Sequence, residues 1–191
     1  MQSTQTRQDY SEKKIKRYRE QDADKVRAYL EKIVSIPKSK LVYVDETGID
    51  SYLCREHCYC LRGQKVIGCI SGKRYRRVGI VAAKMQTDIL APLQYDGTMD
   101  SLLFETWFNQ CLLPALPDQS VVIMDNAAFH RKTRLTLMAQ NNGHSIIFLP
   151  PYSPQLNPIE NFWAWLKGKI RSSVRDFNSI DDAISYCFQV V

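Results

Sequence analysis

The stretch from Val121 to Lys167 constrains the fold more than any other part of this chain. It begins with the apolar run Val121–Met124, which is short, rich in β-branched residues and bounded by turn formers, so it predicts a buried strand. Asp125 follows at once and places a carboxylate at the carboxyl end of that strand. In open α/β sheets this edge carries the ligand sites. An aspartate after a buried strand can also be a simple turn former.

A second carboxylate, Glu160, lies at the end of the proline-rich segment 149–160. Three prolines before Asn157 exclude a helix over that segment. Asn157 as N-cap, with Pro158 at the first helical position, predicts that a helix starts there. Glu160 then falls in the first helical turn. The alternative is a capping box, in which Glu160 accepts a hydrogen bond from the backbone N–H of Asn157.

A third acidic residue, Asp45, continues an apolar run at 41–44 that predicts another strand. Alternation along the strand puts Asp45 on the same face as Leu41 and Tyr43, and Glu46 on the opposite face. A carboxylate within so apolar a strand is costly to bury unless it is paired or bound to a metal. Asp45 is therefore a candidate metal ligand.

Three motifs in this chain carry a family resemblance. They are Val-Asp-Glu-Thr-Gly at 44–48, Met-Asp-Asn-Ala-Ala-Phe-His at 124–130 and Leu-Pro-Pro-Tyr-Ser-Pro-Gln-Leu-Asn-Pro-Ile-Glu-Asn-Phe-Trp at 149–163. Together they resemble the catalytic domain of the IS630/Tc1/mariner transposases. In the insertion-sequence and Tc1-like branches of that group, the second and third acids of a D,D,E triad are separated by the same spacing that this chain has, 34 residues (126–159). The resemblance extends from about Lys40 to the C-terminus.

The resemblance implies a ribonuclease H-like α/β fold, with a mixed central sheet flanked by helices, and a catalytic triad of Asp45, Asp125 and Glu160. Carboxylates on rigid elements suit Mg²⁺ or Mn²⁺. Two such ions can assist an in-line displacement at phosphorus, so we expect the three acids to be ligands of two ions. The implied reaction is hydrolysis of a phosphodiester at a transposon end, followed by attack of the freed 3′-hydroxyl on target DNA.

Two other functions stay open on the sequence. A ribonuclease H-like nuclease or resolvase that acts without strand transfer would have similar composition and spacing. A catalytically inert DNA-binding remnant could also retain the three acids. For the transposase, the expected partners are transposon ends and target DNA, bound by a homodimer or a larger oligomer.

Composition agrees with a protein that acts on nucleic acid without proving it. The 191 residues carry a formal net charge of +6, with a sequence pI near 9.0, which favours a polyanionic partner. Hydrophobic residues make up 45% of the chain, enough for one core of ordinary size. No apolar run approaches the length of a membrane span. We therefore expect a soluble cytoplasmic protein, associated with the nucleoid if it is bacterial.

The N-terminal 38 residues are predicted to be separate from a catalytic domain at 39–191. After a polar start, Lys13–Ile36 is rich in charged residues and carries apolar residues at helical spacing, so it predicts a charged linker helix that ends before Pro37. In the resembling transposases such a linker follows helix-turn-helix modules. These 38 residues are too few to hold them, so a separate helix-turn-helix chain is a possible partner.

Basic residues and cysteines supply further candidate sites. The residues that we expect to contact DNA are Arg62, Lys73, Arg74, Arg76, Arg77, His130, Arg131, Lys167 and Arg171. For any single one of them, a solvated surface position is the alternative. Four cysteines (Cys54, Cys58, Cys60 and Cys69) cluster, but without paired C-x2-C knuckles. Reduced thiols that pack as small hydrophobes are favoured there over a structural zinc.

The remaining elements complete the expected order. Two strands in hairpin order are predicted at Ser51–Arg55 and Arg76–Lys84, a helix at Asp100–Leu113, a short basic helix at Arg131–Gln140, and a strand at Ser145–Leu149. The helix that begins at Asn157 carries a buried face of Ile159, Phe162, Trp163, Leu166 and Ile170, and a terminal helix starts at Ser179. This order of strands and helices is the one expected for the ribonuclease H-like fold.

Overall fold

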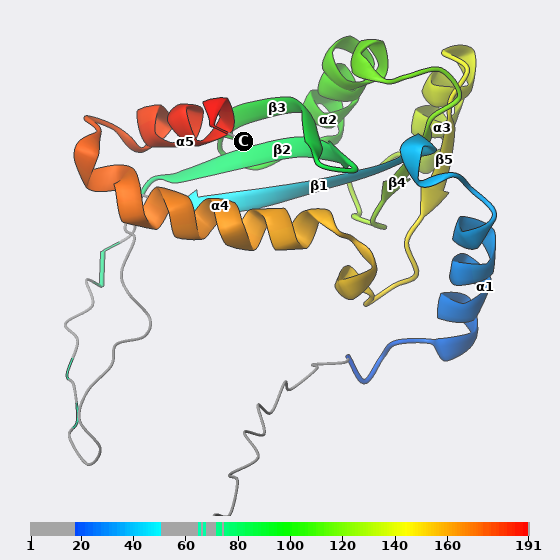
Figure 1. Ribbon diagram of the computed structural model, residues 1–191, viewed down its shortest axis with the longest axis horizontal. Coiled ribbons are helices and arrows are strands. Elements are labelled where there is room, and N and C mark those ends of the chain that lie inside the picture. The colour runs from blue at the N-terminus through cyan, green and yellow to red at the C-terminus, as the bar shows by residue number, and fades with distance from the viewer. Residues whose placement is uncertain (1–17, 51–64, 66, 68–71, 74, 191) are drawn as a thin grey trace, which may run out of the picture.

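The fold is a single sheet with helices on both faces (Figure 1). The computed structural model describes residues 18–50, 65, 67, 72, 73 and 75–190. The strands are β1 (Leu41–Asp50), β2 (Arg77–Met85), β3 (Asp88–Asp96), β4 (Val121–Met124) and β5 (Ser145–Phe148). The helices are α1 (Ala23–Val34), α2 (Ser101–Trp107), α3 (Lys132–Asn141), α4 (Ile159–Ser173) and α5 (Ile180–Gln189).

The five strands are ordered β3-β2-β1-β4-β5. The first three in the chain pair antiparallel as a meander, whereas β4 pairs parallel with β1, and β5 parallel with β4. Strand β1 is therefore central and has neighbours of both orientations. The predicted mixed sheet flanked by helices is confirmed.

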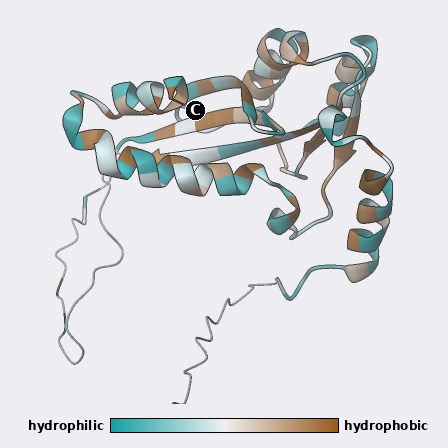
Figure 2. Ribbon diagram, in the orientation of Figure 1, coloured by the Kyte–Doolittle hydropathy of each residue, from teal (hydrophilic) through white to brown (hydrophobic). Residues whose placement is uncertain are grey.

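The two faces of the sheet have different cores. Val42 and Val44 of β1 point to one face, where they pack in a core with α2 and α3. On the other face, α1 covers Leu41 and its neighbours on β4, and α4 and α5 cover β2. Figure 2 shows the hydrophobic residues concentrated along the strands. Since Asp45 follows the alternation of Leu41 and Tyr43, it points to this second face, at the border between the two helical covers.

Strand β3 was not predicted, and its sequence explains why. It contains Pro92, which is tolerated because β3 is an edge strand. Its pairing with β2 also shifts register between Val81 and Ala83, and Ala91 has a positive φ of 49°. The indole of Trp107 donates to the carbonyl of Ala91, a contact that tertiary structure supplies. The predicted strand at Ser51–Arg55 lies outside the described residues.

Two helix boundaries differ from the predictions. The linker helix begins at Ala23, because the side chain of Asp22 caps it by accepting from the N–H groups of Asp24 and Lys25. Residues 18–22 precede it without helical structure, and 13–17 lie outside the described residues. The predicted helix at 100–113 starts as expected at the Asp100 cap, but after Trp107 it continues as a π-helical turn and then a 3₁₀ turn.

Candidate active site

The three acids that the motifs single out line one cavity of about 490 Å³. Asp45 comes from β1, Asp125 follows β4, and Glu160 lies in the first turn of α4. The parallel register pairs Tyr43 with Ile123, so the two aspartates sit two residues further along neighbouring strands. The proline-rich loop that leads into α4 forms another part of the wall. We call this space the acidic cavity.

Asp45 is surrounded by groups that disfavour its charge. Burial, and next the negative charges of Glu160 and Glu46, raise the pKa of Asp45 to about 8. The indole N–H of Trp163, on α4, donates to its carboxylate at 3.0 Å and opposes this shift in part. Asp45 therefore lies where a bound cation would relieve an electrostatic cost.

Asp125 has the opposite environment because a histidine lies beside it. His130 Nδ1 is 3.2 Å from the Asp125 carboxylate, and its Nε2 is 3.4 Å from Glu46. Burial lowers the pKa of His130, but hydrogen bonds with Asp125 and Glu46, together with their charges, outweigh it and raise the pKa to about 9. For Asp125, burial raises the pKa, but His130, the Ala127 N–H and Lys132 lower it below 3.8. Asp125 is thus ionised at neutral pH.

His130, which was expected to contact DNA, is enclosed within the protein. Its side chain is 2% exposed, and both ring nitrogens face carboxylates of the protein. Its ring also packs against those of Phe104 and Phe129. A side chain so enclosed can orient Asp125 but presents no surface to a DNA strand.

The start of α4 differs in detail from the prediction and bears on Glu160. The helix begins at Ile159, with Pro158 at the cap position and no side-chain cap hydrogen bond. Asn157 is buried and donates from its amide to the carbonyl of Val44 on β1. Asn157 therefore joins the helix start to the strand that carries Asp45, and the capping box considered for Glu160 does not form. Glu160 is in the first turn, as predicted, and its side chain is exposed.

The cavity fits a divalent cation by its donor set. Three acidic residues line it, and the unfavourable charge at Asp45 is what a cation would offset. Among the described residues, no three His, Cys, Asp or Glu side chains are already grouped closely enough to hold one ion. Asp45 is turned toward Trp163, and Asp125 toward His130. Binding would therefore require these carboxylates to rotate into the cavity.

Two of the basic candidates lie at the wall of a second cavity, of about 500 Å³. Arg77 at the start of β2 and Lys167 on α4 line it together with Glu46. Gly48 leaves room there for Arg77, since a Cβ at that position would lie 2.0 Å from the guanidinium Nε. Two cations and one carboxylate thus meet at the wall of this second cavity.

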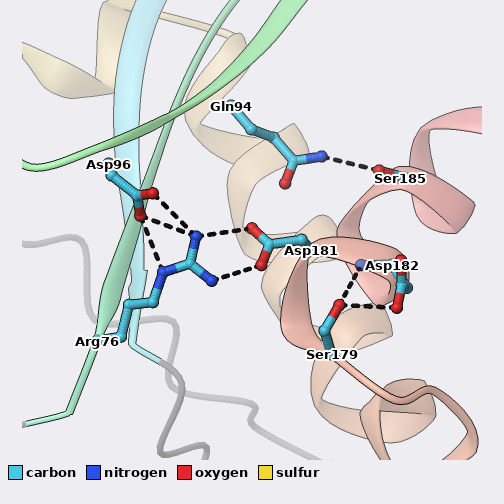
Figure 3. Close-up of polar contacts among 7 residues, drawn as sticks. All are labelled: Arg76, Gln94, Asp96, Ser179, Asp181, Asp182 and Ser185. Carbon is cyan, nitrogen blue, oxygen red and sulfur yellow. Dashed lines mark hydrogen bonds and ion pairs between the residues drawn. The ribbon is translucent and has the colours of Figure 1, made fainter.

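The other basic candidates are distributed over the surface. Arg76 lies between Asp96 and Asp181, which ties the end of β3 to α5 (Figure 3). Arg131 pairs with Glu105 at 2.6 Å. These two arginines are therefore bound to the protein's own carboxylates, while remaining half-exposed. Lys73 and Arg171 are exposed, and Arg62 and Arg74 lie outside the described residues.

Several residues of the site were not predicted to belong to it. Glu46 and Trp163 contact the acids or the histidine from neighbouring positions, and Tyr18 lies in the wall of the acidic cavity. The Asp45-Glu46 dipeptide is the one signal that could have indicated Glu46. Trp163 was placed correctly on the buried face of α4, but a helical pattern does not show where an indole N–H points.

The cysteine prediction concerns residues that the structure does not describe. Cys54, Cys58, Cys60 and Cys69 lie outside the described residues. Cys111 and Cys187 are free thiols, the first exposed and the second buried.

Within the described part of the chain, no helix is both long enough and apolar enough to cross a membrane.

Comparison with known sequences identifies the family. The pattern of the DDE superfamily endonucleases matches residues 40–183, and the chain therefore belongs to that family. A protein of Sinorhizobium fredii (strain NBRC 101917 / NGR234), described as the uncharacterized protein y4pE/y4sA, is 35% identical over 68 residues. Those residues are 36% of this chain and 47% of that protein.

Several solved structures of similar fold are of the Mos1 transposase. A Mos1 mariner paired-end complex with Mn has a TM-score of 0.65 and 14% identity, over 94% of this chain and 64% of that one. A Mos1 paired-end complex with the left transposon end has a TM-score of 0.63 and 15% identity, over 83% and 53%. The likeness confirms the ribonuclease H-like fold, and with the family match it confirms the resemblance that the motifs predicted. The chain spans about half the length of the Mos1 chain in the complex with the left transposon end and of the Sinorhizobium protein.

Proposed function

We propose that residues 39–191 form the catalytic domain of an IS630/Tc1/mariner-type DNA transposase, preceded by a linker segment at 1–38. Asp45, Asp125 and Glu160 are its catalytic acids. The observation that carries this proposal is that these three residues, from two strands and a helix far apart in the sequence, line the same cavity. The family match over 40–183 supports it independently.

The acids would hold divalent cations, Mg²⁺ or Mn²⁺, and we propose two. The Mos1 structures with Mn and with Mg support a divalent metal for this fold. When bound, such ions supply charge stabilisation at a phosphodiester and assist ionisation of the attacking hydroxyl. The carboxylates of Asp45 and Glu160 would neutralise them from one side, and Asp125, kept ionised by His130, from another.

The proposed reaction has two displacements at phosphorus. In the first, a water oxygen bonds to the phosphorus, the bond to the 3′ oxygen breaks, and that oxygen gains a proton. In the second, the new 3′-hydroxyl oxygen bonds to a phosphorus of target DNA, and a target 3′-hydroxyl leaves. Asp45 and Asp125 lie on adjacent strands of one rigid sheet. Their positions would orient the reacting groups in both displacements.

The DNA backbone would approach over the second cavity, which Arg77 and Lys167 line. Arg171 lies one turn beyond Lys167 on α4 and would extend this track. Lys73 and the remaining basic candidates, Arg62, Arg74, Arg76 and Arg131, would contribute more diffusely to the positive field around it. His130 is left out of this set because it is enclosed.

We propose DNA as the partner, both transposon ends and target, bound by a dimer or larger assembly. The Mos1 complexes with a transposon end and in a strand transfer complex support this for the fold. A separate helix-turn-helix chain is one proposed source of end recognition. A cytoplasmic, nucleoid-associated location would follow from such a role in a bacterium.

The test uses the whole chain with Mg²⁺ and two DNA assays. Nicking of a supercoiled plasmid measures hydrolysis, and joining of a labelled 3′-hydroxyl oligonucleotide to the plasmid measures strand transfer. The transposase proposal expects both activities, each abolished by EDTA. Nicking without joining would favour the nuclease or resolvase, and DNA binding without either reaction would favour the inert remnant.

A further inference from the structure

Two tyrosines stand at the wall of the acidic cavity without belonging to the acid triad. Tyr18 precedes α1, and Tyr152 lies in the proline-rich loop ahead of Glu160; both line the cavity. Their ring centroids are 6.2 Å apart with an interplanar angle of 40°. They are 54% and 56% exposed, so the pair contributes little to any core.

Hydrogen bonds of Gln21 link the segment that carries Tyr18 to the loop that carries Tyr152. Gln21 donates to the hydroxyl of Ser153 at 2.8 Å and to the carbonyl of Tyr152 at 3.4 Å. The Ser153 hydroxyl in turn donates to the carbonyl of Pro151 and is buried. The segment before α1 is thus joined to the proline-rich loop, beside the cavity that both tyrosines line.

The backbone of Tyr152 is in an uncommon conformation for its residue type. Its φ is 55°, in the left-handed region that glycine and asparagine adopt far more readily than an aromatic residue. Such a conformation carries a local cost and persists where the surrounding structure imposes it. Here that cost is not offset by burial of the ring, which remains exposed. A binding role for the ring accounts for both observations.

We propose that Tyr18 and Tyr152 form a stacking platform for an unpaired nucleobase of the DNA strand whose phosphodiester lies in the acidic cavity. This inference rests on the proposed function and names a substrate contact of the same site. Exposed aromatic rings stack on bases irrespective of sequence, because every base has a flat π face. A single-stranded nucleotide next to the cleaved phosphate would be ordered in this way.

The test is a binding cycle that requires no catalysis. Fluorescence anisotropy compares a labelled dT 12-mer with an abasic 12-mer of the same backbone, in Ca²⁺, an oxygen-binding cation, to balance the acidic cavity. We expect the wild-type chain to bind the dT 12-mer on the order of tenfold more tightly, the effect of about one stacked base. Tyr152→Asn should remove most of that preference and leave affinity for the abasic strand unchanged.

The variants separate stacking from folding. Asparagine tolerates the left-handed backbone at position 152, so Tyr152→Asn should fold at least as stably as wild type. Tyr152→Phe keeps an aromatic ring and should show the wild-type preference for dT. Tyr18→Ala removes the other ring and should reduce that preference. As a control, Tyr186→Ala removes a half-exposed ring from α5, remote from the cavity, and should keep the preference.

The inference is overturned if wild type binds both strands equally, or if Tyr152→Asn keeps the preference for dT. Neither result touches the proposed function, which is decided by nicking and joining. Conversely, the chain could prefer dT through Tyr152 and yet neither nick nor join DNA. That result would support the stacking platform and contradict the proposed transposase function.

Discussion

Two carboxylates in this protein have opposite electrostatic surroundings. Glu105 on α2 is 3% exposed, and two arginines at the beginning of α3 reach it: Arg131 at 2.6 Å and Arg134 at 3.0 Å. Asp45 on β1 forms no ion pair with a cation in the described part of the chain, and its charged neighbours there include Glu160 and Glu46. Burial therefore leads to neutralisation by the protein at Glu105 and to a raised pKa at Asp45.

The difference distinguishes Glu105, whose surroundings indicate a structural role, from Asp45, whose surroundings favour binding of a proton or a cation. A buried carboxylate paired with arginines is complete without any addition. One placed among like charges at a cavity wall destabilises the protein unless a proton or a cation joins it. This contrast agrees with metal binding at Asp45 and with a role for Glu105 in joining α2 to α3.

The largest effect should come from Asp125→Asn. Asn keeps an oxygen to accept from the Ala127 N–H, now 2.9 Å away, so folding should survive. DNA nicking in Mg²⁺ should fall by several orders of magnitude, because the charge that would hold a cation is lost. Circular dichroism checks the fold and plasmid nicking the activity. Wild-type nicking by the variant would make Asp125 a turn former.

The next effect should be on stability, at the other carboxylate. Glu105→Gln removes the charge that Arg131 and Arg134 share, and we expect the free energy of unfolding to fall by about 1–3 kcal/mol. Both arginines are half-exposed and can turn to water, which limits the loss. Urea denaturation measures it. Nicking per folded molecule should persist, and a complete loss of it in folded protein would place Glu105 in the chemistry.

A smaller effect should appear in the pH dependence of stability without metal. Because folding raises the Asp45 pKa from 3.8 to about 8, the folded chain retains a proton that the unfolded chain releases in that range. The free energy of unfolding should therefore fall as pH rises through the window, by at most about 1.4 kcal/mol per pH unit.

Comparison with Asp45→Asn isolates this contribution. His130 adds a decline of the same sign between 6.5 and about 9, so the difference between wild type and variant is the informative quantity. In EDTA, the melting temperature of Asp45→Asn should exceed that of wild type at pH 8 and approach it near pH 4. Added Mg²⁺ should raise the melting temperature of wild type more than that of Asp45→Asn. Parallel curves for the two proteins would contradict the raised pKa.

The smallest effect should be that of Glu160→Gln on stability. Glu160 is exposed and caps nothing, and its charge raises the cost of ionising Asp45. Loss of that repulsion should offset the lost attraction of a carboxylate for a helix N-terminus, for a net change within about 1 kcal/mol. Thermal unfolding in EDTA measures it, while nicking in Mg²⁺ should collapse. An active Glu160→Gln protein would remove this residue from the triad.

Most of the fold could be predicted because its elements have strong local signals. The apolar run before Asp125 and the prolines before α4 each indicate an element without reference to the rest of the chain. Strand β3 lacks such a signal. Pro92 and the left-handed Ala91 argue locally against a strand, and it forms because β2 offers it a partner.

The sequence by itself determined the order of the elements from α2 onward, the three acids and their spacing, since periodicity and motifs are local properties of a chain. Only the tertiary structure decided how these acids are surrounded. Whether a carboxylate is paired with arginines, as Glu105 is, or left among like charges, as Asp45 is, depends on residues brought from distant positions. The same holds for His130, which a list of basic residues assigns to DNA. The packing of α2 and the loop after β4 encloses it instead between Asp125 and Glu46.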